Sequence, residues 1–214
     1  MDNLPIAIES TVELWLNDEH ITTFLCSPYD LEILGIGHLL TRGIISSVEK
    51  IIDISVDYEN LKINVFTNEL IKAEDKFSVP KFILSGVSSI NNFNDNIYKI
   101  SKVRNDVSFD LNLIHKTAKY MVDNAPLYKE TGGVHAAIIK DSNNNFSLKE
   151  DIGRHCAVDK AIGDFSVNNY DLSNCFIATT GRISLDMLLK SAVMGIPVVV
   201  SLKRPSSLAI ELAN

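Results

Sequence analysis

The chain has 214 residues and a mass of 23.7 kDa, and 46% of its residues are hydrophobic, which suffices for one large domain or two small ones. Its formal charge of −7 and isoelectric point near 5.2 exclude the broad basic surface that nucleic acids or anionic lipids require. There is neither a signal-peptide pattern nor an apolar stretch of membrane-spanning length, so we expect a cytoplasmic protein with no membrane and no nucleic-acid partner. The three cysteines are too widely spaced for a redox pair, a zinc site or a disulfide framework: Cys26, Cys156 and Cys175.

Two strands and a helix are predicted at the start of the chain. Residues 6–26 alternate between apolar and polar side chains about a turn at Asn17-Asp18. Ser27-Pro28 has the pattern of an N-cap followed by proline in the first turn of a helix. The leucines and isoleucines that follow give this helix an apolar face, and Gly43 is expected to end it.

A second hairpin is predicted at residues 51–56 and 61–66, which alternate about a turn near Glu59-Asn60. The periodicity then fades, and several asparagines appear between residues 68 and 107. We expect a long loop with short strands in this part of the chain.

The second half of the chain alternates helices with strands. Ser108 is predicted to cap a helix that ends near Asn124, because Ala125 precedes a proline and so disfavours the helical conformation. A turn at Asn143-Asn144-Asn145 then separates two strands. The expected elements are strands at 134–140, 146–150, 176–180 and 197–202, and helices from about 155, at 184–194 and from about 206.

This order is a β-hairpin followed by a βαβαβα series, which predicts a parallel sheet layered with helices. No internal repeat or low-complexity tract competes with that interpretation. We therefore expect an α/β protein in two parts. Residues 1–107 form an N-terminal α+β part with β-hairpins, and residues 108–214 form an α/β domain.

Basic residues follow three of the predicted strands. Arg154, Arg182 and the pair Lys203-Arg204 each lie in a strand-to-helix turn. Such turns share the edge at the carboxyl ends of the strands, where open α/β sheets bind ligands. Helix N-termini favour anions, and arginine forms two parallel hydrogen bonds to phosphate. The pattern therefore indicates a phosphorylated ligand.

Structural ion pairs are the alternative explanation of the same arginines. Arg154 is close in sequence to Asp151 and Asp159, and Arg182 is close to Asp186. Exposed pairs of this kind contribute about 0–1 kcal/mol to stability and need no ligand. The sequence leaves both explanations open.

Three further side chains have two explanations each. His155 and Asp159 lie four residues apart on one helix face, which suits either an acid/base pair or a histidine bonded to the backbone. His135 is interpreted as a hydrogen-bonding residue of a pocket, since no partner has metal-ligand spacing. Cys156 at a helix start is either a reactive thiol or a small buried residue.

Several motifs, in order along nearly the whole chain, resemble the formate dehydrogenase accessory sulfurtransferase family, FdhD. Upstream, Pro28-Tyr29-Asp30-Leu31-Glu32, Gly35-Ile36-Gly37 and Gly43-Ile44-Ile45 are similar to its first helix region. The downstream motifs are Thr131-Gly132-Gly133-Val134-His135-Ala136-Ala137, Glu150-Asp151-Ile152-Gly153-Arg154-His155, Ala157-Val158-Asp159-Lys160, Thr180-Gly181-Arg182-Ile183-Ser184, Gly195-Ile196-Pro197 and Pro205-Ser206-Ser207-Leu208-Ala209.

The resemblance implies a cytidine deaminase-like layer sandwich in the C-terminal part and a role in maturing formate dehydrogenase. Family members accept persulfide sulfur from a cysteine desulfurase and deliver it to the molybdenum or tungsten bis-guanine-dinucleotide cofactor of the formate dehydrogenase catalytic subunit, for which GDP is a surrogate. A homodimer is left open. The resemblance implies these cofactor-binding residues: Thr131, Gly132, Gly133, His135, Asp151, Gly153, Arg154, His155, Asp159, Lys160, Gly181, Arg182 and Ser184.

Two departures from the family pattern affect the sulfurtransferase activity that the resemblance implies. The persulfide loop of the family has the pattern C-G-x-C, whereas the matching stretch is Ser85-Gly86-Val87-Ser88. A hydroxyl group cannot carry sulfur as a thiolate does, which leaves Cys156 as a substitute carrier without precedent in the family. Typical members also continue beyond the last helix.

Two other functions are weighed against sulfur transfer. The first is a non-catalytic relative that binds the guanine dinucleotide cofactor or serves as a chaperone for the enzyme. The second is a zinc-dependent nucleoside deaminase, which needs H-x-E and C-x-x-C motifs. We reject the deaminase, because His135-Ala136-Ala137 supplies no glutamate and the chain has no C-x-x-C.

Overall fold

The computed structural model describes residues 5–68 and 102–214. Its N-terminal part is a four-stranded sheet with one α-helix against it. The elements are β1 (Ser10–Leu16), β2 (Glu19–Cys26), α1 (Leu31–Thr41), a 3₁₀ turn (Val48–Lys50), β3 (Ile51–Asp57) and β4 (Lys62–Thr67).

Both predicted hairpins of the N-terminal part are confirmed, and they join into one sheet with strand order β2-β1-β4-β3. The join is a parallel pairing of β1 with β4, which sets Leu14 opposite Ile63. Val12, Leu14 and Leu16 alternate along β1 and are buried in the core that α1 completes. One face of the sheet is thus apolar because of the period-2 alternation in the sequence.

The C-terminal part contains a second four-stranded sheet with helices on both faces. It begins with two helices, α3 (Leu111–Asn124) and α4 (Pro126–Thr131). The remaining elements are β5 (His135–Asp141), β6 (Phe146–Asp151), α5 (Arg154–Val167), a 3₁₀ turn (Leu172–Asn174), β7 (Cys175–Thr179), α6 (Leu185–Val193), β8 (Val198–Ser201) and α7 (Ser207–Ala213).

The prediction of a parallel sheet is wrong, because the C-terminal sheet is mixed with strand order β6-β5-β7-β8. β5 is antiparallel to both of its neighbours, and only β7 and β8 pair in parallel. The crossover through α5 passes over β5, since the hairpin already places β6 on the far side of that strand. β6, β7 and β8 therefore all run in one direction, and β5 alone runs against them.

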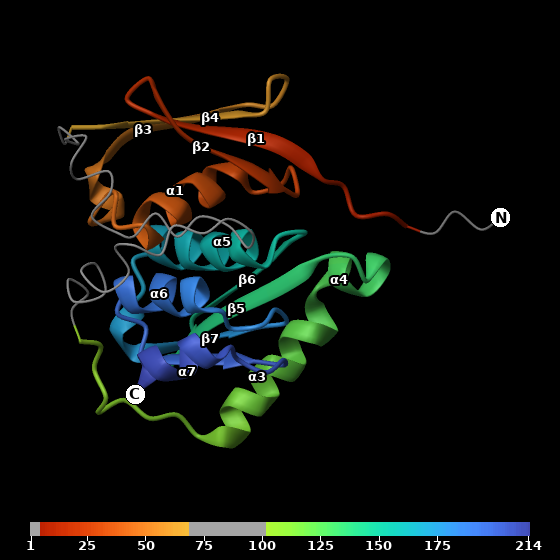
Figure 1. Ribbon diagram of the computed structural model, residues 1–214, viewed down its shortest axis with the longest axis vertical. Coiled ribbons are helices and arrows are strands. Elements are labelled where there is room, and N and C mark those ends of the chain that lie inside the picture. Colours follow the sequence, from red (N-terminus) through yellow and green to blue (C-terminus); the bar gives the residue numbers. More distant parts are fainter. Residues whose placement is uncertain (1–4, 69–101) are drawn as a thin grey trace.

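The two parts stack through their helices, as Figure 1 shows: the N-terminal sheet, α1, a layer with α5 and α6, the C-terminal sheet, and α3 on its far side. Glycines let α1 and α5 approach closely. A Cβ atom on Gly37 would lie 1.8 Å from the carbonyl oxygen of Asp159, and one on Gly163 would lie 2.4 Å from that of Ile33. The backbones of the two helices are therefore in direct contact.

Local sequence rules located most helix ends, with two errors. Ser184 and Ser206 cap α6 and α7, and Gly43, with φ +63°, follows the end of α1. The cap of α1 is Asp30 and not Ser27, while Asp110, two residues after Ser108, caps α3. The side chain of Asp110 accepts a hydrogen bond from the backbone N–H of Asn112, as an N-cap does.

The division of the chain at residues 107 and 108 stays a prediction about its domains. The expected loop with short strands, which includes Ser85 and Ser88, lies largely outside the described residues. Within the described ranges, no helix is both long and apolar enough to cross a membrane.

Candidate functional site

The predicted convergence of the basic turns is supported by strand direction, although the sheet is mixed. Because β6, β7 and β8 run the same way, Arg154, Arg182 and the Lys203-Arg204 pair follow strand ends at a single edge. His135 begins β5 at this edge, opposite Asp151 at the end of β6. We call this edge, with the loops that follow or precede these strand ends, the carboxyl edge.

Arg154 lies against the turn after β7, because Gly181 has no side chain. A Cβ atom on Gly181 would come within 2.8 Å of Cβ and 3.2 Å of Cδ of Arg154. The Nε atom of Arg154 is buried and finds no hydrogen-bond partner among the described residues. Gly153 precedes it as the N-cap of α5, so no side chain caps the first turn of that helix. A guanidinium and a helix N-terminus thus meet without an acceptor in the part of the chain that the structure describes.

His135 lies beside Arg154 and His155 at the carboxyl edge. Its Nδ1 is 3.3 Å from Oγ1 of Thr180, which also accepts a hydrogen bond from the N–H of Ala136. Partial burial lowers the pKa of His135, and the nearby charges of Arg154 and His155 lower it further. The hydrogen-bonding role predicted for His135 therefore has its partner in Thr180.

The Thr131-Gly132-Gly133 loop ends α4, a helix that the sequence reading missed. The carboxylate of Glu150 in β6 accepts hydrogen bonds from the N–H groups of Leu127 and Tyr128, and so caps the start of this helix. Gly132 has φ +61°, and a Cβ atom there would meet nothing within 4 Å. Glu150 therefore holds the start of α4, and the loop at its other end is open at Gly132.

The two other basic turns are exposed and lie against each other. Oγ of Ser201 donates to the carbonyl of Gly181, and the N–H of Ser206 donates to the carbonyl of Ile183. Arg182 and the Lys203-Arg204 pair are exposed to solvent. Within residues 5–68 and 102–214, none of these basic residues forms an ion pair, so the predicted pairing of Arg182 with Asp186 is wrong. The alternative pairing of Arg154 with Asp151 or Asp159 is wrong as well.

Asp151 and Lys160 form a fully buried ion pair, with Nζ 2.7 Å from Oδ2. Both residues also bond Ser27, since Asp151 accepts from its N–H and Lys160 donates to its carbonyl oxygen. Burial raises the pKa of Asp151 despite the charge of Lys160. These two predicted site residues thus join the N-terminal part to β6 and α5, and neither side chain reaches solvent.

Asp159 lies in a second buried cluster that joins three helices. Its carboxylate contacts Nζ of Lys190 at 2.5 and 2.7 Å, Oγ1 of Thr41 at 2.8 Å and Nδ1 of His38 at 3.2 Å. Burial acts to raise the pKa of Asp159, but Lys190 and His38 outweigh it and hold that pKa well below its usual range. Burial lowers the pKa of His38, despite its contact with Asp159.

His155 does not pair with Asp159, so the predicted acid/base pair is wrong. Its Nδ1 lies instead 2.9 Å from Oδ2 of Asp186 in α6, near enough for an ion pair although not aligned as a hydrogen bond. Arg42 at the end of α1 donates two hydrogen bonds to the same carboxylate, of 2.6 and 3.2 Å. The sequence reading missed Arg42, because 144 residues separate it from Asp186.

All three cysteines of the chain are buried, and none has the features of a reactive thiol. Burial, followed by the negative charges of Asp151 and Asp159, raises the pKa of Cys156 well above its usual value. Burial likewise raises the pKa of Cys26 to about 12 and that of Cys175. The expectation of a lowered thiol pKa at the start of α5 is wrong, and Cys156 is a core residue.

We expect the thiols to resist alkylation in the native protein. Iodoacetamide should modify all three cysteines within minutes in denaturant and only a small fraction in native buffer, because the thiolate is both disfavoured and enclosed. Intact-mass spectrometry measures the number of adducts. Asn143→Cys, at an exposed turn, is the positive control for reagent activity. Rapid alkylation of Cys156 in native buffer would contradict the buried placement.

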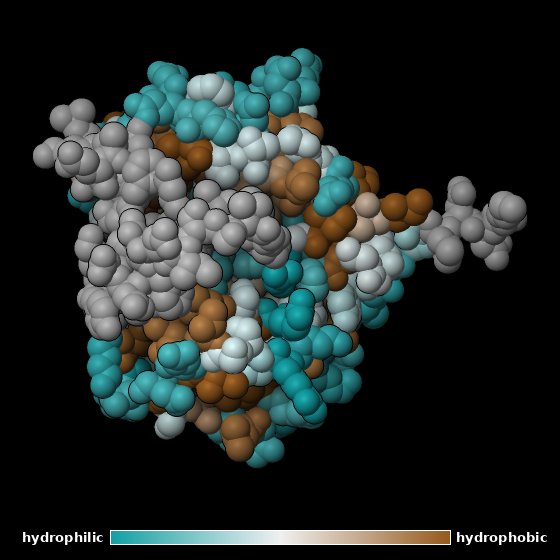
Figure 2. Space-filling model, viewed as in Figure 1, coloured by the Kyte–Doolittle hydropathy of each residue, from teal (hydrophilic) through white to brown (hydrophobic). Residues whose placement is uncertain are grey.

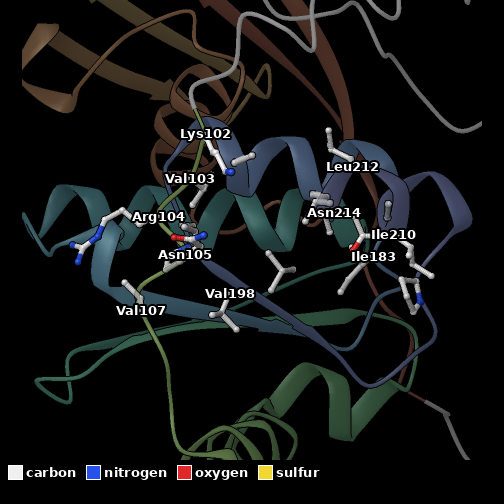
Figure 3. A pocket seen from close by; sticks show the side chains of 18 residues that line it. Lys102, Val103, Arg104, Asn105, Val107, Ile183, Val198, Ile210, Leu212 and Asn214 are labelled. Carbon is white, nitrogen blue, oxygen red and sulfur yellow. The ribbon is translucent and has the colours of Figure 1, made fainter.

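A cavity of about 830 Å³ lies beside the carboxyl edge, and none of the described residues that line it is a predicted site residue. Figure 3 shows the 102–107 segment on one side of it, Ile210 and Leu212 on the other, and Val198 between them. Most of the residues that line the cavity are apolar. Figure 2 shows hydrophobic residues in separate patches on one face of the molecule. A phosphorylated ligand fits the carboxyl edge better than this cavity.

The described residues contain no cluster of three or more histidine, cysteine, aspartate or glutamate side chains that could hold a metal ion. Cationic and amide donors gather at the carboxyl edge instead. Among the described residues, this edge has one guanidinium without a partner, a helix start without a side-chain cap, two histidines and two exposed basic turns, all of which favour an anion over a metal ion.

Comparisons with known proteins agree with the motifs at this edge. The family model described as FdhD/NarQ family matches residues 7–214. A protein named sulfur carrier protein FdhD, from Picrophilus torridus, is 32% identical, and the alignment covers 98% of this chain and 82% of that protein. One of the same name from Shouchella clausii is 28% identical over 98% of this chain and 80% of its own length.

A solved structure adds the fold to this similarity. The crystal structure of a candidate formate dehydrogenase accessory protein from Desulfotalea psychrophila matches with a TM-score of 0.77 and 29% identity, covering 97% of this chain and 79% of that one. The family match thus extends over both sheets and all the helices of the described residues. The chain belongs to the FdhD/NarQ family.

Proposed function

We propose that the chain is a formate dehydrogenase accessory protein that holds the guanine dinucleotide cofactor of that enzyme by its phosphates at the carboxyl edge. The observation that carries this proposal is Arg154, whose buried Nε has no acceptor among the described residues. Leaving a charged buried donor unsatisfied costs more than about 1–3 kcal/mol, and a phosphate oxygen would relieve that cost.

The other residues of the edge fit the same ligand. The first turn of α5 has free N–H groups, which favour an anion together with the helix dipole. Gly181 provides room for Arg154, and Gly132 leaves space above its loop for a bulky group. We propose direct contact with the ligand for Thr131, Gly132, Gly133, His135, Gly153, Arg154, His155, Gly181 and Arg182.

Four of the predicted cofactor-binding residues act indirectly in this proposal. Asp151 and Lys160 bond to each other and to Ser27, and Asp159 bonds to Lys190, all in the interior. Ser184 caps α6 through the N–H of Met187. These side chains hold α5 and the turn after β7 in place, and so fix the donors that face the ligand.

The finer features implied by the family resemblance belong to the same proposal. They are a cytidine deaminase-like layer sandwich in the C-terminal part, a molybdenum or tungsten bis-guanine-dinucleotide cofactor as the cargo, and two partners, the formate dehydrogenase catalytic subunit and a cysteine desulfurase. The cofactor supplies the metal chemistry in its own enzyme. The residues of the carboxyl edge bind and orient its diphosphate.

Sulfur transfer is the second step that the family resemblance implies, and the cysteines of this chain speak against it. A sulfur carrier needs an accessible thiolate, whereas Cys26, Cys156 and Cys175 are all buried. We therefore favour cofactor binding over sulfur transfer as the function of this chain. Incubation with a desulfurase and cysteine should give no sulfur adduct by intact mass, and an adduct lost in Cys156→Ala would reverse this order.

Titration with GDP tests the proposed function. Arg154→Ala and Arg182→Ala should each weaken GDP binding by roughly 10- to 100-fold, because each removes a charge-assisted hydrogen bond to phosphate. Isothermal titration calorimetry at low salt measures the dissociation constants. Added salt should weaken binding further, since exposed charges are screened.

A matched control uses an arginine away from the edge. Arg104 is exposed and pairs with Asp106, so Arg104→Ala should leave GDP affinity within about twofold. Wild-type affinity in both Arg154→Ala and Arg182→Ala would refute the anion site.

A further inference from the structure

The carboxylate of Asp186 lies between a guanidinium from the end of α1 and an imidazole from α5. Arg42, directly after α1, approaches it with both terminal nitrogens, at 2.6 and 3.2 Å, and His155 of α5 approaches with Nδ1, at 2.9 Å. Arg42 and Asp186 are about one-fifth exposed and His155 is 30% exposed. The three side chains thus form a row that joins the end of α1 to the start of α5 at the carboxyl edge.

Asp186 remains ionised in this row. Burial acts to raise its pKa, but His155, Arg42 and Lys190 outweigh burial and hold that pKa well below its usual range. A carboxylate held at one ring nitrogen of a histidine directs a proton to that nitrogen and leaves the other nitrogen for a ligand. In His155 the nitrogen left for a ligand is Nε2.

We propose that Asp186, clamped by Arg42, is a positioning residue that fixes the ring of His155 so that its Nε2 binds a phosphate oxygen of the nucleotide. This inference rests on the proposed anion site. It adds that ligand binding at this site is accompanied by protonation of His155. A ring flanked by the carboxylate on Nδ1 and by phosphate on Nε2 carries a proton on each nitrogen, and the second proton is gained from solvent. Binding of a nucleoside diphosphate is therefore coupled to proton uptake.

The groups around His155 come from every neighbouring element. Asp186 and Arg42 face it from α6 and α1, Arg154 precedes it on α5, and His135 lies near it on β5. Lys190 is one turn along α6 from Asp186 and is paired with Asp159. Among these groups, His135 is the other histidine that could take up a proton, so the experiment must separate the two rings.

The first measurement needs no ligand. Long-range ¹H–¹⁵N spectra of the full chain in mildly alkaline buffer identify which ring nitrogen of His155 is protonated, with His155→Gln to assign the signal. We expect the Nδ1–H form in the wild type and a shift toward the Nε2–H form in Asp186→Asn, with recovery in Asp186→Glu. Asp106→Asn makes the same change at the exposed Arg104–Asp106 pair and should leave the signal unaltered. An Nε2–H form in the wild type would overturn the proposal.

The second measurement tests the coupling with GDP. Calorimetry in buffers of different ionisation enthalpy should show proton uptake for the wild type. His135→Gln should bind GDP more weakly, because His135 contacts the ligand, but should retain the same proton uptake per mole of GDP bound. Uptake should be lost in His155→Gln and in Asp186→Asn, with binding roughly 10-fold weaker. GDP binding without proton uptake by the wild type would overturn this inference and leave the proposed function standing. Absence of GDP binding, beside the Nδ1–H form of His155, would remove the proposed function and leave the positioning of the ring.

Discussion

Gly37→Ala should destabilise the protein by more than about 3 kcal/mol, although alanine favours helices by about 1 kcal/mol over glycine. The added methyl group would lie 1.8 Å from the carbonyl oxygen of Asp159 and 2.6 Å from its carbonyl carbon. Both are backbone atoms of α5 and cannot turn aside, so the helices must separate. Thermal unfolding should show the midpoint lowered by about 10 °C for a chain of this size.

Gly35→Ala is the matched control on the same helix. Its methyl group would meet side-chain atoms of Ile63 at 2.9 Å and Leu14 at 3.4 Å, which can shift, so we expect a smaller loss. Gly163→Ala should resemble Gly37→Ala, because its methyl group would lie 2.4 Å from the carbonyl oxygen of Ile33. The double variant should cost less than the sum, since either change alone opens the same contact. Equal stability of Gly35→Ala and Gly37→Ala would contradict the close approach of the helices.

Lys190→Met should lower the free energy of unfolding by about 3–5 kcal/mol at neutral pH. Lys190 and Asp159 are each at most 2% exposed, and the substitution leaves the carboxylate of Asp159 buried without its cation. Thr41 and His38 retain their contacts with that carboxylate, but neither supplies the lost full charge. Urea unfolding of both proteins measures the difference.

The loss in Lys190→Met should shrink in acid. In the wild type the pKa of Asp159 lies below its usual range, so its stabilisation is complete above the unfolded value near about 4 and fades as the pH falls below that. In the variant the carboxyl group favours its neutral form, and protonation relieves the burial cost. A deficit that stays constant from neutral pH to below about 4 would contradict an ionised Asp159.

Lys119→Met provides the control for that prediction. Lys119 pairs with Asp123 one turn away on α3, and both side chains are more than half exposed. Its removal should cost less than about 0.5 kcal/mol, because exposed pairs of this kind contribute little. A comparable loss in both variants would show that the burial of the Lys190–Asp159 pair is unimportant.

Sequence reasoning located the features that depend on neighbours along the chain. The turn at Asn17-Asp18, the starts of α6 and α7 near Ser184 and Ser206, and the end of α1 near Gly43 all follow from local backbone preferences. The helix α4 was missed for a related reason. Ala125-Pro126 correctly ends α3, but proline is also favoured at the first position of a new helix, and the cap comes from Glu150.

The partners of the charged residues could not be found from spacing. Four-residue intervals favour pairing His155 with Asp159 and Arg182 with Asp186. In the folded protein, Asp159 pairs with Lys190 and Asp186 pairs with Arg42. Sheet direction failed similarly, since nothing local reveals that β7 pairs beside β5. The carboxyl edge was still predicted, because its basic residues depend only on β6, β7 and β8 running one way.

Ser27 uses its N–H, its hydroxyl and its carbonyl oxygen on Asp151, Ile152 and Lys160, more than 120 positions further along the chain. During synthesis the N-terminal sheet is complete once β4 has left the ribosome. At that stage Asp151, Ile152 and Lys160 have not yet been synthesised, so the polar groups of Ser27 that bond to them are still hydrated. The N-terminal and C-terminal parts therefore associate late in synthesis. The buried pair of Asp151 and Lys160 is enclosed only at that point.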